Sequence, residues 1–275
     1  MDVVMTIAGS DSGGGAGIQA DLKTFQELKV FGTSVITALT AQNTLGVQGI
    51  YPTTPEFVEQ QLTSVFQDFQ VKALKTGMLF SAEIIETVAR ILQQQDVKIV
   101  VDPVMIAKGG ASLLQNDAVQ ALNTKLLPLA TVLTPNIPEA EVISGIKIEN
   151  ERDIYHAAKR ILQFGVKCVV MKGGHLEETD TATDTVFFED GLSFSMETKR
   201  IDTQHTHGTG CTFSSAITAF LGRGFSLQEA IVEAKKFVQL AIEQPLNIGH
   251  GHGPTNHFAY QEAHGNYEVT IYEAK

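Results

Sequence analysis

Short apolar runs alternate with segments of helical periodicity along this chain, and this alternation limits the possible folds more than any other feature. Between the runs, apolar residues recur at the spacing of one helix face, as they do over residues 81–94 and 153–164. Strands that alternate with helices favour an α/β fold, in which ligands bind at the carboxyl ends of the strands. The runs that predict strands cover residues 3–8, 34–41, 73–76, 98–101, 131–134 and 167–171.

Size, charge and cysteine content narrow the class of protein. A chain of 275 residues with 43% hydrophobic residues can bury a substantial core, and no repeat or linker divides it. Its net charge of −11 argues against a nucleic-acid surface, and no apolar run is long enough for a membrane span. The start lacks a signal-peptide pattern and the two cysteines give no disulfide framework. We therefore expect a cytoplasmic protein that binds small molecules, with neither nucleic acid nor membrane as a partner.

The segment 206–212 combines a glycine-rich turn with the start of a strongly patterned helix. Gly208 and Gly210 let successive backbone N–H groups point inward, and the helix dipole adds partial positive charge. Gly208, Thr209 and Gly210 therefore favour an anion site. Cys211 is expected in the first helical turn, where its thiol pKa is predicted to be lowered. The alternative is a small buried residue at a tight turn.

A second glycine-rich segment, residues 9–17, follows the first predicted strand. Its spacing fits neither of the two common nucleotide-binding glycine loops. The glycines and the short side chains of Asp11 and Asp21 are instead expected to approach a small substrate. Gln42 follows another strand, and its amide can both donate to and accept from a heterocycle. An exposed turn glutamine is the alternative.

Acidic and amide side chains follow two further strands. Asp102 stands where a strand ends, which suits either a Mg²⁺ ligand or an ordinary turn, and the nearby Lys108 belongs to a segment expected to move as a lid. Asn136 and Glu139 are three residues apart at a helix start, which fits a helix cap or a metal environment. The strands expected within Asp184–Glu197 predict a hairpin at the sheet edge, through which two copies could form a homodimer.

Seven motifs in a fixed order together give a more specific indication than any one of them. They are Ala8–Asp21, Ala41–Thr44, Lys75–Met78, Asp102–Met105, Thr134–Ala140, Lys172–His175 and His207–Thr212. In sequence and order they closely resemble the hydroxymethylpyrimidine/phosphomethylpyrimidine kinases of the ribokinase-like superfamily. The resemblance runs from about residue 3 to residue 258.

The resemblance implies one α/β kinase domain over residues 1–260 and a C-terminal tail over residues 261–275. It implies a mainly parallel central sheet flanked by helices, with an edge hairpin. It further implies that ATP and Mg²⁺ serve in the phosphorylation of hydroxymethylpyrimidine and then of its monophosphate, in thiamine synthesis.

The resemblance also assigns roles to individual residues. Cys211 stands where related sugar kinases carry an aspartate base, and Gly208, Thr209 and Gly210 form the anion hole for the transferred phosphate. The implied substrate contacts are Gln42, Asp21, Gly9, Met78 and Val104. The implied ATP contacts are Lys172, Asn136, Lys235 and Thr209, and the implied metal environment consists of Asp102 and Glu139.

Two alternatives remain on this scaffold. A vitamin B6 kinase branch shares it and sometimes carries a cysteine beside the lid lysine. Ala107 stands at that position here, which together with Ala41–Thr44 favours the pyrimidine over pyridoxal. Activity on pyridoxal or pyridoxine is the first alternative, and a non-catalytic ligand-sensing domain is the second.

Overall fold

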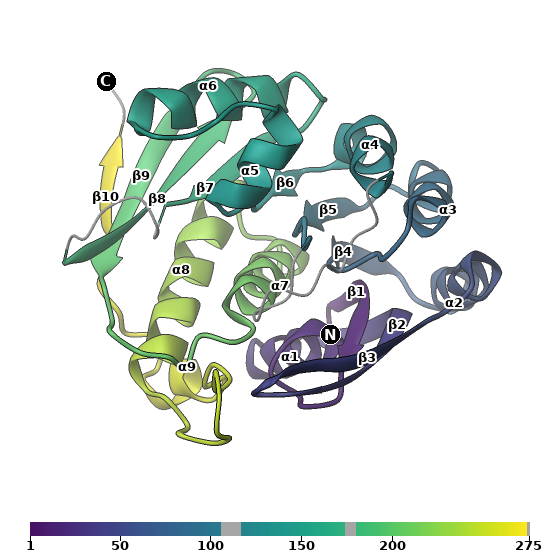
Figure 1. Ribbon diagram of the computed structural model, residues 1–275, viewed down its shortest axis with the longest axis horizontal. Coiled ribbons are helices and arrows are strands. Elements are labelled where there is room, and N and C mark those ends of the chain that lie inside the picture. The colour runs from purple at the N-terminus through teal and green to yellow at the C-terminus, as the bar shows by residue number, and fades with distance from the viewer. Residues whose placement is uncertain (106–116, 174–179, 274–275) are drawn as a thin grey trace.

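The computed structural model describes residues 1–105, 117–173 and 180–273. In this part of the chain, ten strands form one sheet in the order β10-β9-β8-β7-β6-β5-β4-β1-β2-β3 (Figure 1). The strands are β1 (Val3–Asp11), β2 (Phe31–Asn43), β3 (Gly46–Pro52), β4 (Val71–Thr76), β5 (Lys98–Val101), β6 (Val132–Leu133), β7 (Cys168–Lys172), β8 (Thr181–Phe188), β9 (Ser193–Lys199) and β10 (Thr270–Glu273).

The centre of the sheet is parallel. β1 pairs in parallel with β2 and β4, and parallel pairing continues from β4 through β5 and β6 to β7. The carboxyl ends of these strands therefore lie at one edge of the sheet, where α/β proteins place their ligands. The prediction of an α/β fold with a mainly parallel sheet is confirmed.

Helices cover both faces of the sheet (Figure 1). In α6, for example, the buried residues Ile154, Ala157, Ala158 and Ile161 recur at the spacing of one helix face. The core on one face is shared with α1 (Gly17–Glu27), α7 (Thr209–Gly222) and α8 (Leu227–Glu243), beside the short α9 (Ala259–Glu262). The core on the other face is shared with α2 (Pro55–Asp68), α3 (Ala82–Leu92), α4 (Ala118–Ala121), η1 (Leu122–Leu126), η2 (Leu127–Leu129), α5 (Ile137–Ser144) and α6 (Glu151–Leu162).

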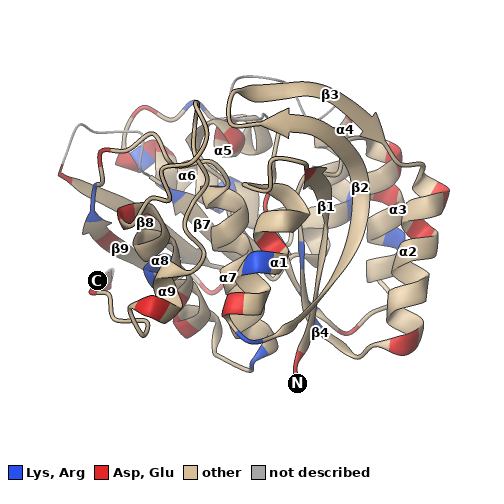
Figure 2. Cartoon of the chain, turned by 90° about the horizontal axis from the view of Figure 1, so that it is seen from below, with Lys and Arg blue, Asp and Glu red and all other residues tan. Residues whose placement is uncertain are grey.

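Two strands of the structure are not predicted by the sequence patterns. β3 pairs antiparallel with β2, and the two strands curve together over one side of the molecule (Figure 2). β10 pairs antiparallel with β9. The predicted hairpin is present as β8 and β9, but β10 covers its outer edge, so the hairpin does not end the sheet. All four residues of β10 are exposed, and the strand therefore lacks a buried pattern that would reveal it.

The outer helices carry charged residues, with acidic positions at the ends of α2 and α3 in Figure 2. Among the helices of the described chain, none is both long and apolar enough to cross a membrane. The predicted lid with Ala107 and Lys108, and the motif residue His175, lie outside the described residues.

Residues 249–257, which we call the C-terminal strap, connect segments that are distant in the sequence. The backbone N–H of His252 donates to the carbonyl oxygen of Thr44 at 2.9 Å. The backbone N–H of Thr255 donates to the carbonyl oxygen of His207 at 3.2 Å. The strap therefore joins the end of β2 to the turn before α7.

His257 at the end of the strap is a buried histidine that is neutral in the folded protein. Its side chain is 4% exposed, and its Nε2 lies 3.1 Å from the hydroxyl of Thr212 in α7. Burial, with a smaller contribution from the charge of Lys23, lowers the pKa of His257 to about 4. The folded protein therefore resists protonation at this site.

We predict that His257 makes the protein less stable as the pH falls below 6.5. The unfolded chain binds a proton at His257 below its ordinary pKa of 6.5, whereas the folded protein binds it only below about 4. Acidification from pH 7.5 to 5 should therefore cost roughly 2 kcal/mol of unfolding free energy through this residue. Urea unfolding of the wild type and of His257→Gln at both pH values measures the effect. Equal losses in the two proteins would contradict it.

Candidate active site

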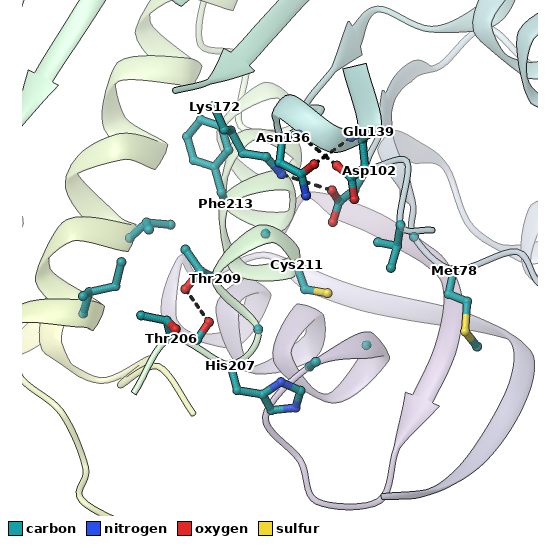
Figure 3. Close-up of a pocket in the computed structure, with 18 of the residues that line it drawn as sticks. Met78, Asp102, Asn136, Glu139, Lys172, Thr206, His207, Thr209, Cys211 and Phe213 are labelled. Carbon is teal, nitrogen blue, oxygen red and sulfur yellow. Dashed lines mark hydrogen bonds and ion pairs between the residues drawn. The ribbon is translucent and has the colours of Figure 1, made fainter. Parts of the chain in front are cut away.

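A cavity of about 770 Å³ opens at the carboxyl edge of the parallel strands, a volume typical of a small-molecule site. Its walls come from the ends of β1, β2 and β7, from the segments after β4, β5 and β6, from β8 and the end of β9, and from α8 and the start of α7. Figure 3 shows part of this lining. The predicted site residues that line it are Gly9, Gln42, Met78, Asp102, Val104, Asn136, Glu139, Lys172, Gly208, Thr209, Gly210, Cys211 and Lys235.

The glycine turn before α7 forms one wall of the cavity. Gly208 has a φ of 82° and caps α7 without a side-chain hydrogen bond. A Cβ atom at Gly208 would lie 1.8 Å from the carbonyl oxygen of Gly15, so the position requires glycine. The hydroxyl of Thr209 donates to the carbonyl oxygen of Thr206 at 2.8 Å and stabilises the turn. Because the first N–H groups of a helix lack intrahelical partners, this uncapped end can bind an anion.

Cys211 lies in the first turn of α7, as predicted, and its side chain is partly buried. Desolvation by the surrounding protein raises the pKa of its thiol to about 12, although the Lys75 ammonium and a backbone hydrogen bond from Gly17 act in the opposite direction. The prediction of a lowered thiol pKa is therefore wrong. The loss of hydration outweighs the favourable field at the helix N-terminus.

Asp102, Asn136, Glu139 and Lys172 lie together on another wall of the cavity (Figure 3). Lys172 Nζ is 3.6 Å from Asp102 Oδ1. Asn136 Oδ1 accepts from the backbone N–H of Glu139 at 2.8 Å, and Glu139 Oε2 accepts from the backbone N–H of Asn136 at 2.9 Å. The predicted cap of α5 is thus confirmed. Both capping residues also line the cavity, so capping does not remove them from the site.

The charge of this cluster suits a divalent cation. Burial raises the pKa of Glu139 to about 7, with Lys172 opposing and Asp102 adding to the effect. Within residues 1–105, 117–173 and 180–273, no group of three or more His, Cys, Asp or Glu side chains is arranged to hold a metal. Two carboxylates with an adjacent amide instead fit a Mg²⁺ ion that keeps several of its waters.

Two lysines bring positive charge to the cavity. Lys235 Nζ donates to Asp184 Oδ2 at 2.7 Å, and the backbone N–H of Gly173 donates to Asp184 Oδ1 at 3.2 Å. Lys235 and Asp184 are 7% and 8% exposed, and both line the cavity together with Lys172. Lysines held in this way can bind phosphate groups through charge-assisted hydrogen bonds.

Gly9, Met78, Gln42 and Val104 line a further part of the cavity. A Cβ atom at Gly9 would lie 2.2 Å from Met78 Cε, so glycine leaves room for the methionine side chain. Met78 is held by its backbone, because its carbonyl oxygen accepts from the hydroxyl of Thr37 at 2.6 Å. Gln42 is partly buried and lines the cavity, so it is not an exposed turn residue.

Asp21 differs from its prediction, because the structure does not bring it to the cavity. Its side chain is 0% exposed, and Oδ1 accepts from Lys75 Nζ at 3.0 Å and from the hydroxyl of Ser215 at 2.5 Å. The hydroxyl of Thr6 donates to Oδ2 at 2.6 Å. The helical periodicity of α1 turns Asp21 toward the core, where it is the counter-ion of a buried lysine.

His207 and Asp184 also line the cavity, although the sequence predicted no role for either residue. His207 Nε2 lies 2.8 Å from Asp11 Oδ2 and 3.3 Å from a polar atom of the Gln42 amide. The position of His207 directly before the glycine turn could have indicated that it belongs to the site. Asp184 has no comparable signal, since its role depends on Lys235, which is 51 residues away.

The fold and the site define an α/β protein of the ribokinase-like class whose cavity is suited to phosphate groups. The family model for phosphomethylpyrimidine kinase matches residues 11–256. The hydroxymethylpyrimidine/phosphomethylpyrimidine kinase of Haemophilus influenzae is 57% identical over 260 residues, which are 94% of this chain and 97% of that protein. The enzyme of the same name from Bacillus subtilis is 52% identical over 259 residues, which are 94% and 95% of the two chains.

A solved structure is similar over the whole chain. The pyridoxal kinase from Staphylococcus aureus in complex with AMP-PCP and pyridoxal matches with a TM-score of 0.90 at 35% identity, covering 100% of this chain and 99% of that one. The family model, the related sequences and the solved structure all match this chain to kinases over most of its length. The chain belongs to the phosphomethylpyrimidine kinase family.

We predict that Lys75→Met destabilises the protein by about 3–5 kcal/mol, because it leaves the Asp21 carboxylate buried without its charged partner. Lys75→Met combined with Asp21→Asn should recover much of this loss. Urea unfolding measures both. Lys72→Met is the matched control on the same strand, since the ion pair of Lys72 with Asp2 is solvent-exposed and should contribute little to stability. A Lys75→Met loss no larger than that of the control would refute the prediction.

Proposed function

We propose that this protein phosphorylates 4-amino-5-hydroxymethyl-2-methylpyrimidine and then its monophosphate, with ATP as the donor, in thiamine diphosphate synthesis. One observation carries the proposal: Gln42, Cys211 and Lys172 line the same cavity. An amide for a heterocycle, a thiol beside the hydroxyl and a cation for phosphate are thus within reach of one substrate pair. The names of the relatives from Haemophilus influenzae and Bacillus subtilis support the same substrates.

We propose that Asp102 and Glu139, with Asn136 beside them, hold Mg²⁺ together with the triphosphate of ATP. The ion would neutralise charge on the phosphate oxygens during transfer. The position of both carboxylates on the cavity wall supports this assignment.

The chain's own residues supply positioning and charge neutralisation, which a loose phosphoryl-transfer transition state needs more than a strong base. The backbone N–H groups of Gly208–Cys211 and the ammonium of Lys172 offset charge on the transferred group. Lys235 adds positive charge on the ATP side. With a thiol pKa of about 12, Cys211 keeps its proton at neutral pH and orients the substrate hydroxyl rather than acting as a thiolate base.

Pyridoxal or pyridoxine is the second candidate substrate, because the similar Staphylococcus aureus structure is a pyridoxal kinase with pyridoxal bound. A planar heteroaromatic ring with a hydroxymethyl arm has the same outline as the pyrimidine. The proposal of a non-catalytic sensing domain is less well supported, since the anion turn, the carboxylates and the lysines all line the cavity.

A single kinase domain, a homodimer and a cytoplasmic location stay predictions. Because β10 covers the outer edge of β9, we propose that a dimer contact lies away from that hairpin edge. Light scattering of the full chain measures the oligomeric state.

A substrate panel tests the proposed function. Hydroxymethylpyrimidine, its monophosphate, pyridoxal, pyridoxine and ribose are each incubated with ATP and Mg²⁺, and ADP release is measured. Both pyrimidines should give the highest kcat/KM. Preference for pyridoxal would favour the second candidate, and no substrate-dependent ADP release would favour a sensing domain.

We predict that Cys211→Ala lowers kcat by roughly 10²-fold or more with little loss of ATP binding, because the substrate hydroxyl loses the group that orients it for transfer. Steady-state kinetics and ATP titration measure the two effects. Cys168→Ala is the control, since Cys168 is buried in β7 and does not line the cavity. Unchanged turnover in Cys211→Ala would show that the thiol is not needed and that the backbone N–H groups of the glycine turn act without it.

We predict that Gln42→Met lowers kcat/KM for hydroxymethylpyrimidine by one to two decades, because about 1–3 kcal/mol is lost when the polar edge of the ring stays unpaired. Methionine keeps the approximate volume and removes both hydrogen bonds. Pyridoxine phosphorylation should fall less. Gln48→Met, which changes an exposed glutamine of β3, is the control. Equal losses on both substrates would show that Gln42 does not read the pyrimidine.

A further inference from the structure

The Asp11 carboxylate can only accept hydrogen bonds, and it contacts His207, which lies beside the Gln42 side chain. Its carboxylate accepts from three backbone N–H groups within residues 13–16, at 2.8, 3.1 and 2.8 Å. Burial opposes ionisation, but His207 and these N–H groups together keep the pKa of Asp11 below its ordinary value. Asp11 is therefore ionised at neutral pH and can only accept.

This acceptor fixes the proton of His207. His207 Nε2 lies 2.8 Å from Asp11 Oδ2, and a contact with an ionised oxygen requires a hydrogen on that nitrogen. One polar atom of the Gln42 amide lies 3.3 Å from the same nitrogen. A protonated Nε2 has no lone pair to accept from an amide NH₂ group, whereas an amide oxygen can share its hydrogen with Asp11. Since the oxygen and nitrogen of a carboxamide are distinguished by their partners, the Gln42 atom facing His207 is the carbonyl oxygen.

The contacts at the other polar end of the Gln42 amide independently indicate the same orientation. The hydroxyl of Thr40 lies 2.7 Å from the carbonyl oxygen of Ser10 and 3.1 Å from the other polar atom of the Gln42 amide. The carbonyl can only accept, so the single proton of Thr40 goes to Ser10. Toward Gln42 the hydroxyl can then only accept, which requires the amide NH₂ group at that end.

The main chain of Gln42 is also held in place. Its backbone N–H donates to the hydroxyl of Ser12 at 2.8 Å, and that hydroxyl donates to the carbonyl oxygen of Gln42 at 2.8 Å. Thr40, Gln42, Asp11 and His207 all line the cavity. The amide is thus fixed at its root and at both polar ends, on the wall of the substrate site.

We propose that Thr40 and the Asp11–His207 pair fix the Gln42 carboxamide with its oxygen toward His207 and its NH₂ toward Thr40, and that this fixed order decides which heterocycle the site accepts. Thr40, Asp11 and His207 are then positioning residues for specificity. The inference rests on the proposed function for its substrate, but the amide orientation itself does not depend on it.

The consequence is a pocket that distinguishes an amino group from a carbonyl. A free glutamine can rotate its amide to match a 4-aminopyrimidine, with a ring acceptor beside a donor, or a 4-oxopyrimidine, with a ring donor beside an acceptor. When the contacts with His207 and Thr40 fix the Gln42 amide, the amide presents its donor and its acceptor to the substrate in one order only. The 4-oxo analogue then leaves buried polar groups unpaired, which costs far more than a change in size.

Nuclear magnetic resonance of the full chain tests the orientation without any turnover. The side-chain NH₂ signals of Gln42, assigned by their loss in Gln42→Met, should show nuclear Overhauser effects to the methyl group of Thr40. Effects from the NH₂ group to the ring protons of His207 in place of Thr40 would overturn the proposal.

Kinetics test the specificity. The wild type should prefer 4-amino-5-hydroxymethyl-2-methylpyrimidine over its 4-oxo counterpart by at least ~10²-fold in kcat/KM. Thr40→Val removes the acceptor that holds the NH₂ group, so this ratio should shrink by roughly 3–10-fold, whereas Thr40→Ser keeps the hydroxyl and should keep the ratio. A merely structural role of Thr40 would lower both rates alike, and an unchanged ratio in Thr40→Val would refute the proposal. If the wild type phosphorylates neither pyrimidine, the proposed function and the specificity step fall, while the resonance experiment still decides the orientation.

Discussion

The close backbone approach of Gly15 to Gly208 brings two glycine-rich segments of the site together. At Gly208 a Cβ atom would overlap the Gly15 carbonyl oxygen, and at Gly17 a Cβ atom would lie 2.3 Å from the carbonyl oxygen of Gly9. Glycine at these positions lets the starts of α1 and α7 reach the same cavity. Two helix N-termini then add partial positive charge to one site. His207 directly precedes Gly208 and Cys211 follows it by three residues, so the positions of both depend on the same contact.

Three lysines in or beside the site are each paired with one aspartate. Lys75 pairs with Asp21, Lys172 with Asp102 and Lys235 with Asp184. Each pair is close to neutral as a whole, which limits the cost of burying its charges. The Lys75 pair is fully buried and cannot exchange partners with a ligand. The other two pairs line the cavity, where an incoming phosphate can share their lysines.

The strands and most helices could be predicted because their patterns are local, but β3, β10 and part of the site could not. The strand after which Asp102 stands was predicted with the bounds that the structure shows, 98–101. The pKa of the Cys211 thiol was predicted in the wrong direction, because a helix start is visible in sequence whereas the desolvation around it depends on distant segments. Asp21 shows the same limit. Its counter-ion Lys75 is 54 residues away, so nothing near Asp21 indicates that it is paired inside the core.

Substrate choice in this family must depend on side chains more than on the backbone. The overall fold of this chain is close to that of a pyridoxal kinase, so the shape of the main chain does not separate a pyrimidine from a pyridoxal. The shape of a pocket alone discriminates weakly between substrates, because one methyl group changes the free energy of transition-state binding by only about 1–3 kcal/mol. A buried polar edge discriminates more strongly, provided that it cannot rearrange to fit the wrong ring. In the proposed role of Gln42, the hydrogen bonds that hold its amide therefore matter as much as the glutamine itself, because they would turn an adaptable amide into a fixed one.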